Sequence, residues 1–224
     1  MSFQMLENEL DGANIKVVGI GGAGGNAVNH MIDRGVQGVE FIAINTDKQA
    51  LRRSLAAKTI QLGGQGLGAG ARPDAGRASA EAAREEIRNV LGREHGVPDR
   101  RKHVGKGTGT GASPVVARVA RGTRHPGRWR GLGPFEFEGK KKLQVAEAGI
   151  EQMVELVDSL IVVLNQNLFA VMDEDASLED AFKRADDVLN NAVAGIAEII
   201  NVPGLVSNRF RRRADRHDRR RPRR

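Results

Sequence analysis

The 224-residue chain contains no cysteine and no tyrosine, and tryptophan occurs once. Without cysteine, a disulfide framework and a cysteine-ligated metal site are both excluded. Aromatic residues make up only 4% of the chain, too few for a protein that stacks nucleic-acid bases on aromatic side chains. No apolar run approaches the roughly 18–20 residues of a membrane-spanning helix, and residues 1–14 lack the apolar segment of a signal peptide. These absences predict a soluble cytoplasmic protein.

The basic charge is confined to one end of the sequence. The formal net charge is +7, and residues 211–224 contain nine Arg and two Asp, so nine minus two accounts for the whole excess. Such a tail can bind nucleic acid or anionic lipid without specificity, or it can be a solvated end without a partner. We therefore predict no specific nucleic-acid partner.

Apolar runs and helical stripes alternate along the chain. Strands are predicted at 15–20, 39–45, 59–62 and 159–165. Helices are predicted from the glycine-rich turn to near Gly35, and at 48–55, 74–91, 113–121, 140–158 and 177–201. Asp74 is the expected N-cap of the third helix, which ends near Leu91, and Pro114 is expected in the first position of the fourth. Strands that alternate with helices predict an α/β fold, with a parallel sheet and helices on both faces.

Two interior segments interrupt this alternation. Residues 93–106 and 122–133 fall where a buried strand is expected, yet neither contains an apolar run. Each also contains a proline, which a central strand excludes. The sequence therefore predicts that these two segments are anomalous and do not form ordinary central strands.

A first glycine-rich loop follows the first strand. Gly19, Gly21 and Gly24 fit the pattern GxGxxG between a strand and a helix, in which glycine lets backbone N–H groups approach a phosphate at the positive end of the helix. The pattern alone also fits a tight turn without a ligand. Together with Asp47 after the second strand, it also fits a dinucleotide-binding dehydrogenase.

A second loop, GTGTGASP at 107–114, again precedes a helix. Alternating Gly and Thr provide backbone and hydroxyl donors together, as in a nest for a polyphosphate. The loop is not a Walker A motif, because Lys106 is followed by Gly107 and not by Ser or Thr. Two such loops in one α/β domain predict a nucleotide polyphosphate site.

The second loop resembles the GGGTGTGAAP signature of the tubulin/FtsZ family of GTPases. GIGGAGGNAVNHM, GVEFIAINTDKQAL, GLGAGARPDAGRASAEAA, PFEFEGKKK and DAFKRADDVLNNAVAGIAEII are also similar to bacterial FtsZ, in the same order. The resemblance implies a Rossmann-like GTPase domain that binds GTP, polymerises into the ring of the division septum and hydrolyses GTP between subunits. It also implies a cytoplasmic protein at midcell that reaches the membrane only through partner proteins.

The resemblance assigns the site residue by residue. The first phosphate loop corresponds to Gly22, Ala23, Gly24, Gly25 and Asn26, the signature loop to Gly107, Thr108 and Gly109, the ribose contacts to Glu138 and Lys142, and the guanine contacts to Phe182 and Asp186. Lys142 stands where the family usually has Arg, and it lacks the planar fork of a guanidinium. Mg²⁺ is expected on phosphate oxygens and water, with no metal site made by the protein itself.

The sequence departs from the family after the long helix. Arg209 and Arg212 occupy the positions of the two catalytic Asp residues, and an Arg is always protonated, so it cannot act as a base. The second domain of the family is expected to be missing. These departures and the two interior segments suggest local reading-frame shifts in GC-rich DNA, or else a diverged paralogue.

The predicted organisation has four parts. They are a flexible extension at 1–13, a GTP-binding domain at 14–176, a long central helix at 177–201, and an altered catalytic loop with an Arg-rich tail at 202–224. The leading hypothesis is an FtsZ-type GTP-binding cell-division protein with impaired hydrolysis. The alternative is a non-enzymatic interaction protein that acts through its basic tail.

Overall fold

The main sheet has four parallel strands in the order β3-β2-β1-β4. These strands are β1 (Ile15–Ile20), β2 (Val39–Asn45), β3 (Lys58–Gln61) and β4 (Arg101–Lys102). The computed structural model describes residues 15–64, 66, 68–70, 72–92, 101–102, 108–122, 128–133, 139–164 and 177–201. Every residue of β1 is buried, as expected for a parallel strand covered on both faces.

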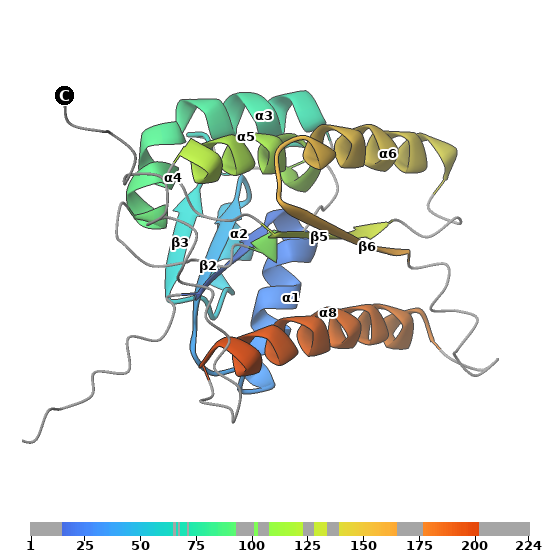
Figure 1. Cartoon of the computed structure of the whole chain (residues 1–224). Helices are drawn as coiled ribbons and strands as arrows, with labels where there is room; N and C mark the ends of the chain where they lie inside the picture. Colours follow the sequence, from blue (N-terminus) through green and yellow to red (C-terminus); the bar gives the residue numbers. More distant parts are fainter. Residues whose placement is uncertain are drawn as a thin grey trace, which may run out of the picture.

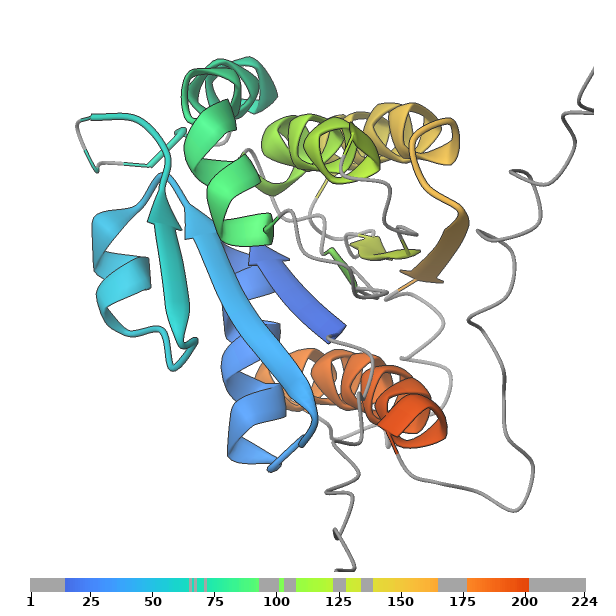
Figure 2. The same cartoon turned by 60° about the vertical axis from the view of Figure 1, so that its left-hand side comes forward.

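Helices cover both faces of this sheet (Figures 1 and 2). On one face, Ile15 and Val17 of β1 and Phe41 of β2 pack against α1 (Gly21–Asp33) and α8 (Leu178–Asn201). On the other, Val18, Ile20, Ile42 and Ile44 pack against α3 (Pro73–Ala82), α4 (Arg84–Leu91) and α5 (Thr108–Gly122). The alternation of side chains along each strand separates the two cores, and the predicted α/β fold is confirmed.

A second pair of strands lies beside α6 (Lys140–Val154). Strands β5 (Arg128–Gly133) and β6 (Ser159–Leu164) are parallel and form a separate two-stranded sheet. Met153 of α6 packs with Ala117 of α5, and Leu160 and Val162 of β6 lie against this cluster. The short helix α2 (Lys48–Arg52) connects β2 with β3.

Both segments that are predicted to be anomalous contain residues that pair in a sheet. Arg101 and Lys102 of β4 pair with Val17 and Val18, and β5 pairs with β6 along its whole length. Parallel pairing joins backbone groups, so the open edges of β1 and β6 can bind a polar chain as well as an apolar one. Pro98 and Pro126 precede the paired residues in the sequence and lie outside the described residues.

Most element boundaries agree with the sequence prediction, and two helix starts differ. Strands 15–20 and 39–45 have the predicted bounds. Helix α3 has Arg72 as its N-cap and Pro73 in its first turn, so Asp74 lies inside the helix and does not cap it. Helix α5 begins at Thr108, and Pro114 therefore lies within the helix. The Gly- and Thr-rich segment, predicted as a loop, already forms its first turns.

Candidate nucleotide site

The N-terminal ends of α1 and α5 meet through backbone atoms. Gly21 has a φ of +74°, and a Cβ added there would lie 2.8 Å from the backbone nitrogen of Gly109. Only glycine combines this positive φ with so close an approach. The contact brings the two glycine-rich loops of the sequence together, as the prediction of one polyphosphate site requires. Gly21 was absent from the predicted contacts, although its place in GxGxxG marked it.

The start of α1 leaves its first amides without a side-chain cap. Its N-cap is Ile20, which makes no side-chain hydrogen bond, and its first turn contains no acidic residue. The first N–H groups of a helix have no partner within the helix, and they form the positive end of its dipole. Gly22 and Asn26 are exposed at this end, Ala23 and Gly25 are half-buried, and Gly24 is buried. The geometry suits an anion above the first turn.

Thr108 is fixed by a second threonine. Its hydroxyl oxygen lies 2.6 Å from that of Thr46, and both side chains are buried, at 5% and 4% exposure. The Thr108 side chain therefore joins the start of α5 to the end of β2.

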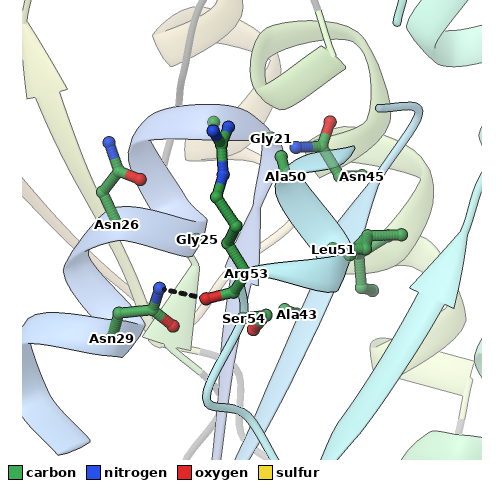
Figure 3. A pocket seen from close by; sticks show the side chains of 12 residues that line it. Gly21, Gly25, Asn26, Asn29, Ala43, Asn45, Ala50, Leu51, Arg53 and Ser54 are labelled. Carbon is green, nitrogen blue, oxygen red and sulfur yellow. Dashed lines mark hydrogen bonds between the residues drawn. The ribbon is translucent and has the colours of Figure 1, made fainter. Parts of the chain in front are cut away.

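A pocket opens between the first turns of α1, the end of β2 and α2 (Figure 3). Its polar lining includes Asn26 and Asn29 of α1, Asn45 of β2, and Arg53 and Ser54 after α2. Asn29 donates to the backbone oxygen of Arg53 at 3.1 Å and accepts from the nitrogen of Leu55 at 2.8 Å. These two bonds fix the α2–β3 connection against α1. Asn45 and Arg53 are not predicted from the sequence, because neither lies in a glycine-rich motif.

The predicted guanine contacts lie one turn apart on α8. Phe182 is 41% exposed, and Asp186 follows at the i+4 position on the same face. The neighbouring Asp187 accepts from His30 at 2.9 Å and from Arg34 at 2.8 Å, which ties α8 to α1. The predicted base side therefore lies against the later part of α1, at His30 and Arg34.

The carboxyl group of Asp186 has a perturbed acidity. Its pKa is raised to about 6, mainly by burial; the neighbouring His30 lowers the pKa and Asp187 raises it. Burial dominates because it penalises the charged form of the acid. Near neutral pH the group is still mainly ionised, so it can accept hydrogen bonds from the donor edge of a purine.

The structure describes only one of the remaining predicted residues. Lys142 lies exposed in the first turn of α6, where its backbone nitrogen donates to Gly139. Gly107, Glu138, Arg209 and Arg212 lie outside the described residues. Within the described residues, no three His, Cys, Asp or Glu side chains are grouped closely enough to hold a metal ion. None of the described helices is long and apolar enough to cross a membrane.

The sheet order, the two glycine-rich helix starts and the adjoining α8 define an α/β nucleotide-binding domain of the tubulin-like class. Residues 14–173 match the Tubulin/FtsZ family, GTPase domain. The chain belongs to this family. This membership decides against the dehydrogenase alternative for the GxGxxG pattern.

Individual relatives agree with this membership. The chain is 47% identical over 211 residues to cell division protein FtsZ of Azotobacter vinelandii and 46% identical to that of Pseudomonas aeruginosa, and each alignment covers 93% of this chain. An empty FtsZ dimer of M. jannaschii has a TM-score of 0.80 at 38% identity, over 87% of this chain and 57% of that one. A GTPγS-bound CetZ2 protofilament protein of Haloferax volcanii, at 22% identity and a TM-score of 0.75, shares the fold. The chain spans about half the length of the curated relatives it matches, at 53%.

Proposed function

We propose that this chain binds GTP across the N-terminal ends of α1 and α5. The observation that carries the proposal is the approach of Gly21 to Gly109, which joins the two glycine-rich segments into one surface. The amides at the start of α1 have no side-chain cap, so a polyphosphate is a suitable partner for them. Of the proposed contacts at the start of α1, Gly22 and Asn26 are exposed, Ala23 and Gly25 are half-buried, and Gly24 is buried.

The base is proposed to lie toward α8. Phe182 offers an exposed ring for stacking, and an ionised Asp186 accepts from N1–H and N2–H₂ of guanine. Adenine presents no such pair of donors to a carboxylate. Lys142, and Glu138 outside the described residues, are the proposed ribose contacts.

Mg²⁺ fits this site as a phosphate-bound ion. The residues around the junction offer amides, hydroxyls and carboxamides, with no carboxylate cluster among those described. Mg²⁺ usually keeps several waters and binds substrate phosphates in such sites. When bound, it would neutralise phosphate charge, while the chain supplies the backbone donors.

We propose a role in cell division, in the cytoplasm at the division site, because relatives at 46–47% identity are cell division FtsZ proteins. Impaired hydrolysis is part of this proposal, since Arg209 and Arg212 replace the carboxylates of the resembled family. Self-association into a polymer, which the resemblance implies for the family, is not proposed for this chain. The alternative, an interaction protein that acts through the basic tail of residues 211–224, predicts binding of polyanions without nucleotide specificity.

Isothermal titration calorimetry with GTP, ATP and NAD⁺ tests the proposal. We expect binding of GTP in the presence of Mg²⁺, with much weaker binding of ATP and NAD⁺. Asp186→Asn is expected to reduce the preference for GTP over ATP, while Asp33→Asn, an exposed acid of α1, leaves it unchanged. Equal binding of all three compounds would support the polyanion alternative, and no binding of GTP would refute the proposal.

A further inference from the structure

One carboxylate oxygen ties α8 to the C-terminal end of α1. Oδ1 of Asp187 accepts from Nε2 of His30 at 2.9 Å and from Nη2 of Arg34 at 2.8 Å. The side chains of His30 and Asp187 are only 22% and 27% exposed, whereas Arg34 is exposed at the surface. Hydrogen bonds between a charged donor and a carboxylate are short and strong compared with neutral ones. Asp187 is therefore held in one direction by two donors from successive turns of α1.

Apolar side chains also join the two helices. One buried cluster contains three residues of each helix: Ala27, Val28 and Met31 of α1, and Leu189, Val193 and Ala197 of α8. Burial of apolar surface is favourable but non-directional. These residues hold α8 against α1, but they do not by themselves fix the rotation of α8 about its axis. The bonds of Asp187 fix this rotation, because the carboxylate has to meet both donors at once.

The rotation of α8 decides where the predicted guanine contacts lie. Asp186 directly precedes Asp187, and Phe182 lies one turn before Asp186. An α-helix has 3.6 residues per turn, so neighbouring side chains point about 100° apart and move together when the helix turns. A fixed direction of Asp187 therefore also fixes the directions of Asp186 and Phe182.

The same groups affect the acidity of Asp186. Its pKa is raised to about 6, mainly by burial; His30 lowers the pKa and Asp187 raises it. The charged and titratable groups that act on His30 are Asp186 and Asp187 from α8 and Arg34 from α1. His30 and Asp187 therefore change the acidity of Asp186 in opposite directions.

We infer that His30 and Arg34 are positioning residues for guanine recognition, which act through Asp187 and not by contact with the nucleotide. This inference rests on the proposed GTP site and adds the residues that hold its base side in place. Guanine offers two donors to a correctly directed carboxylate, and adenine offers no such pair. The contact between α1 and α8 therefore determines the choice of base, whereas the amides at the start of α1 bind the phosphates of either nucleotide.

The experiment measures the affinities of the full chain for GTP and ATP by calorimetry between pH 5 and pH 8. At pH 7.5, His30→Ala is expected to weaken GTP by about fivefold or more, the lower end of couplings between separate sites, and to leave ATP unchanged. His30→Gln keeps a donor without the charge and is expected to restore most of the GTP affinity. Glu198→Gln, at an exposed acid of α8, is the matched control.

The pH profile is a readout that a merely structural role would not change. In the unmodified chain, the ratio of GTP to ATP affinity should fall as the pH drops through about 6, where Asp186 takes up a proton. The ratio removes the titration of the phosphates, which both nucleotides share. Both His30 variants should move this fall to higher pH, because His30 lowers the pKa of Asp186. Asp187→Asn should move it to lower pH, because Asp187 raises that pKa.

The outcomes separate this inference from the proposed function. If the unmodified chain binds GTP and the His30 variants keep both the affinity ratio and its pH profile, the positioning role is overturned and the GTP site stands. Equal losses of GTP and ATP affinity in both His30 variants would assign the contact to stability alone, and would also overturn the inference. If the unmodified chain binds no GTP, the proposed function fails, and the positioning role fails with it.

Discussion

Thr46 and Thr108 share a buried hydrogen bond of 2.6 Å between their hydroxyl groups. Thr46 follows β2, and Thr108 begins α5, so the bond joins the second strand to the second glycine-rich segment. The bond lies close to the contact between Gly21 and Thr108–Gly109. The proposed phosphate surface is therefore held by one side-chain bond and one backbone approach.

The threonine pair gives a prediction about stability. Thr108→Val keeps the shape of the side chain but leaves the Thr46 hydroxyl buried without its partner, which costs about 1–3 kcal/mol. Chemical denaturation should show a lower free energy of unfolding for Thr108→Val and for Thr46→Val. The double variant should lose less than the sum of the two, because it removes both polar groups. Fully additive losses would mean that the two hydroxyls do not interact.

Gly21 and Gly22 form a matched pair for testing the loop junction. A Cβ at Gly21 meets the backbone of Gly109 and requires a φ of +74°, whereas a Cβ at Gly22 meets nothing within 4 Å. The left-handed backbone alone costs an L-residue about 1–2 kcal/mol. We expect Gly21→Ala to lower the thermal midpoint and to weaken GTP binding, and Gly22→Ala to keep its stability. Equal midpoints would show that the two helix starts do not touch.

The raised pKa of Asp186 predicts a pH dependence of guanine recognition. The carboxylate accepts hydrogen bonds from guanine only when it is ionised, and its pKa is about 6. GTP affinity should therefore fall by about tenfold between pH 7 and pH 5, as the ionised fraction falls. The same pH series can be measured with inosine triphosphate, which lacks the N2 amine, and compared with that of GTP. A GTP-to-ATP preference that stays constant across this range would contradict the assigned role.

The Asp186 carboxyl also makes the stability of the chain depend on pH. Stability is expected to fall as the pH rises, whereas GTP affinity is expected to increase. Because burial raises the pKa of Asp186 above that of the unfolded chain, the folded chain binds the proton more tightly, and stability is lost as pH rises from about 4 through 6. Asp186→Asn should then stabilise the nucleotide-free chain near pH 7.5, by roughly 1–2 kcal/mol. The gain should shrink below pH 6. Urea unfolding at several pH values, with Asp33→Asn as control, measures it.

Sequence motifs predict the strands and helix starts that surround the candidate site. Apolar strands such as 15–20 and the glycine-rich helix starts follow from local patterns, and both are present. Asn45 and Arg53 could not be found in this way, because their proximity depends on how α2 packs on α1. The pairing of 101–102 and 128–133 was not predicted. These residues pair through their backbone groups, and the pattern of side chains does not reveal such pairing. Local frame shifts as the origin of these segments remain a prediction, which the encoding DNA tests.

The last prediction concerns turnover. The proposed amide surface for phosphate lies where Gly21 approaches Gly109, but Arg209 and Arg212 stand where the resembled family places carboxylates. A group that orients or deprotonates water contributes about 10²–10⁴-fold to such a reaction, and a guanidinium cannot supply it. We expect bound GTP to remain intact, with phosphate release at the rate of buffer alone and no GTP-dependent light scattering. The variant Arg209→Asp with Arg212→Asp should raise phosphate release if these positions supply the missing group. Release by the unmodified chain that rises steeply with protein concentration would show that hydrolysis does not depend on carboxylates at these positions.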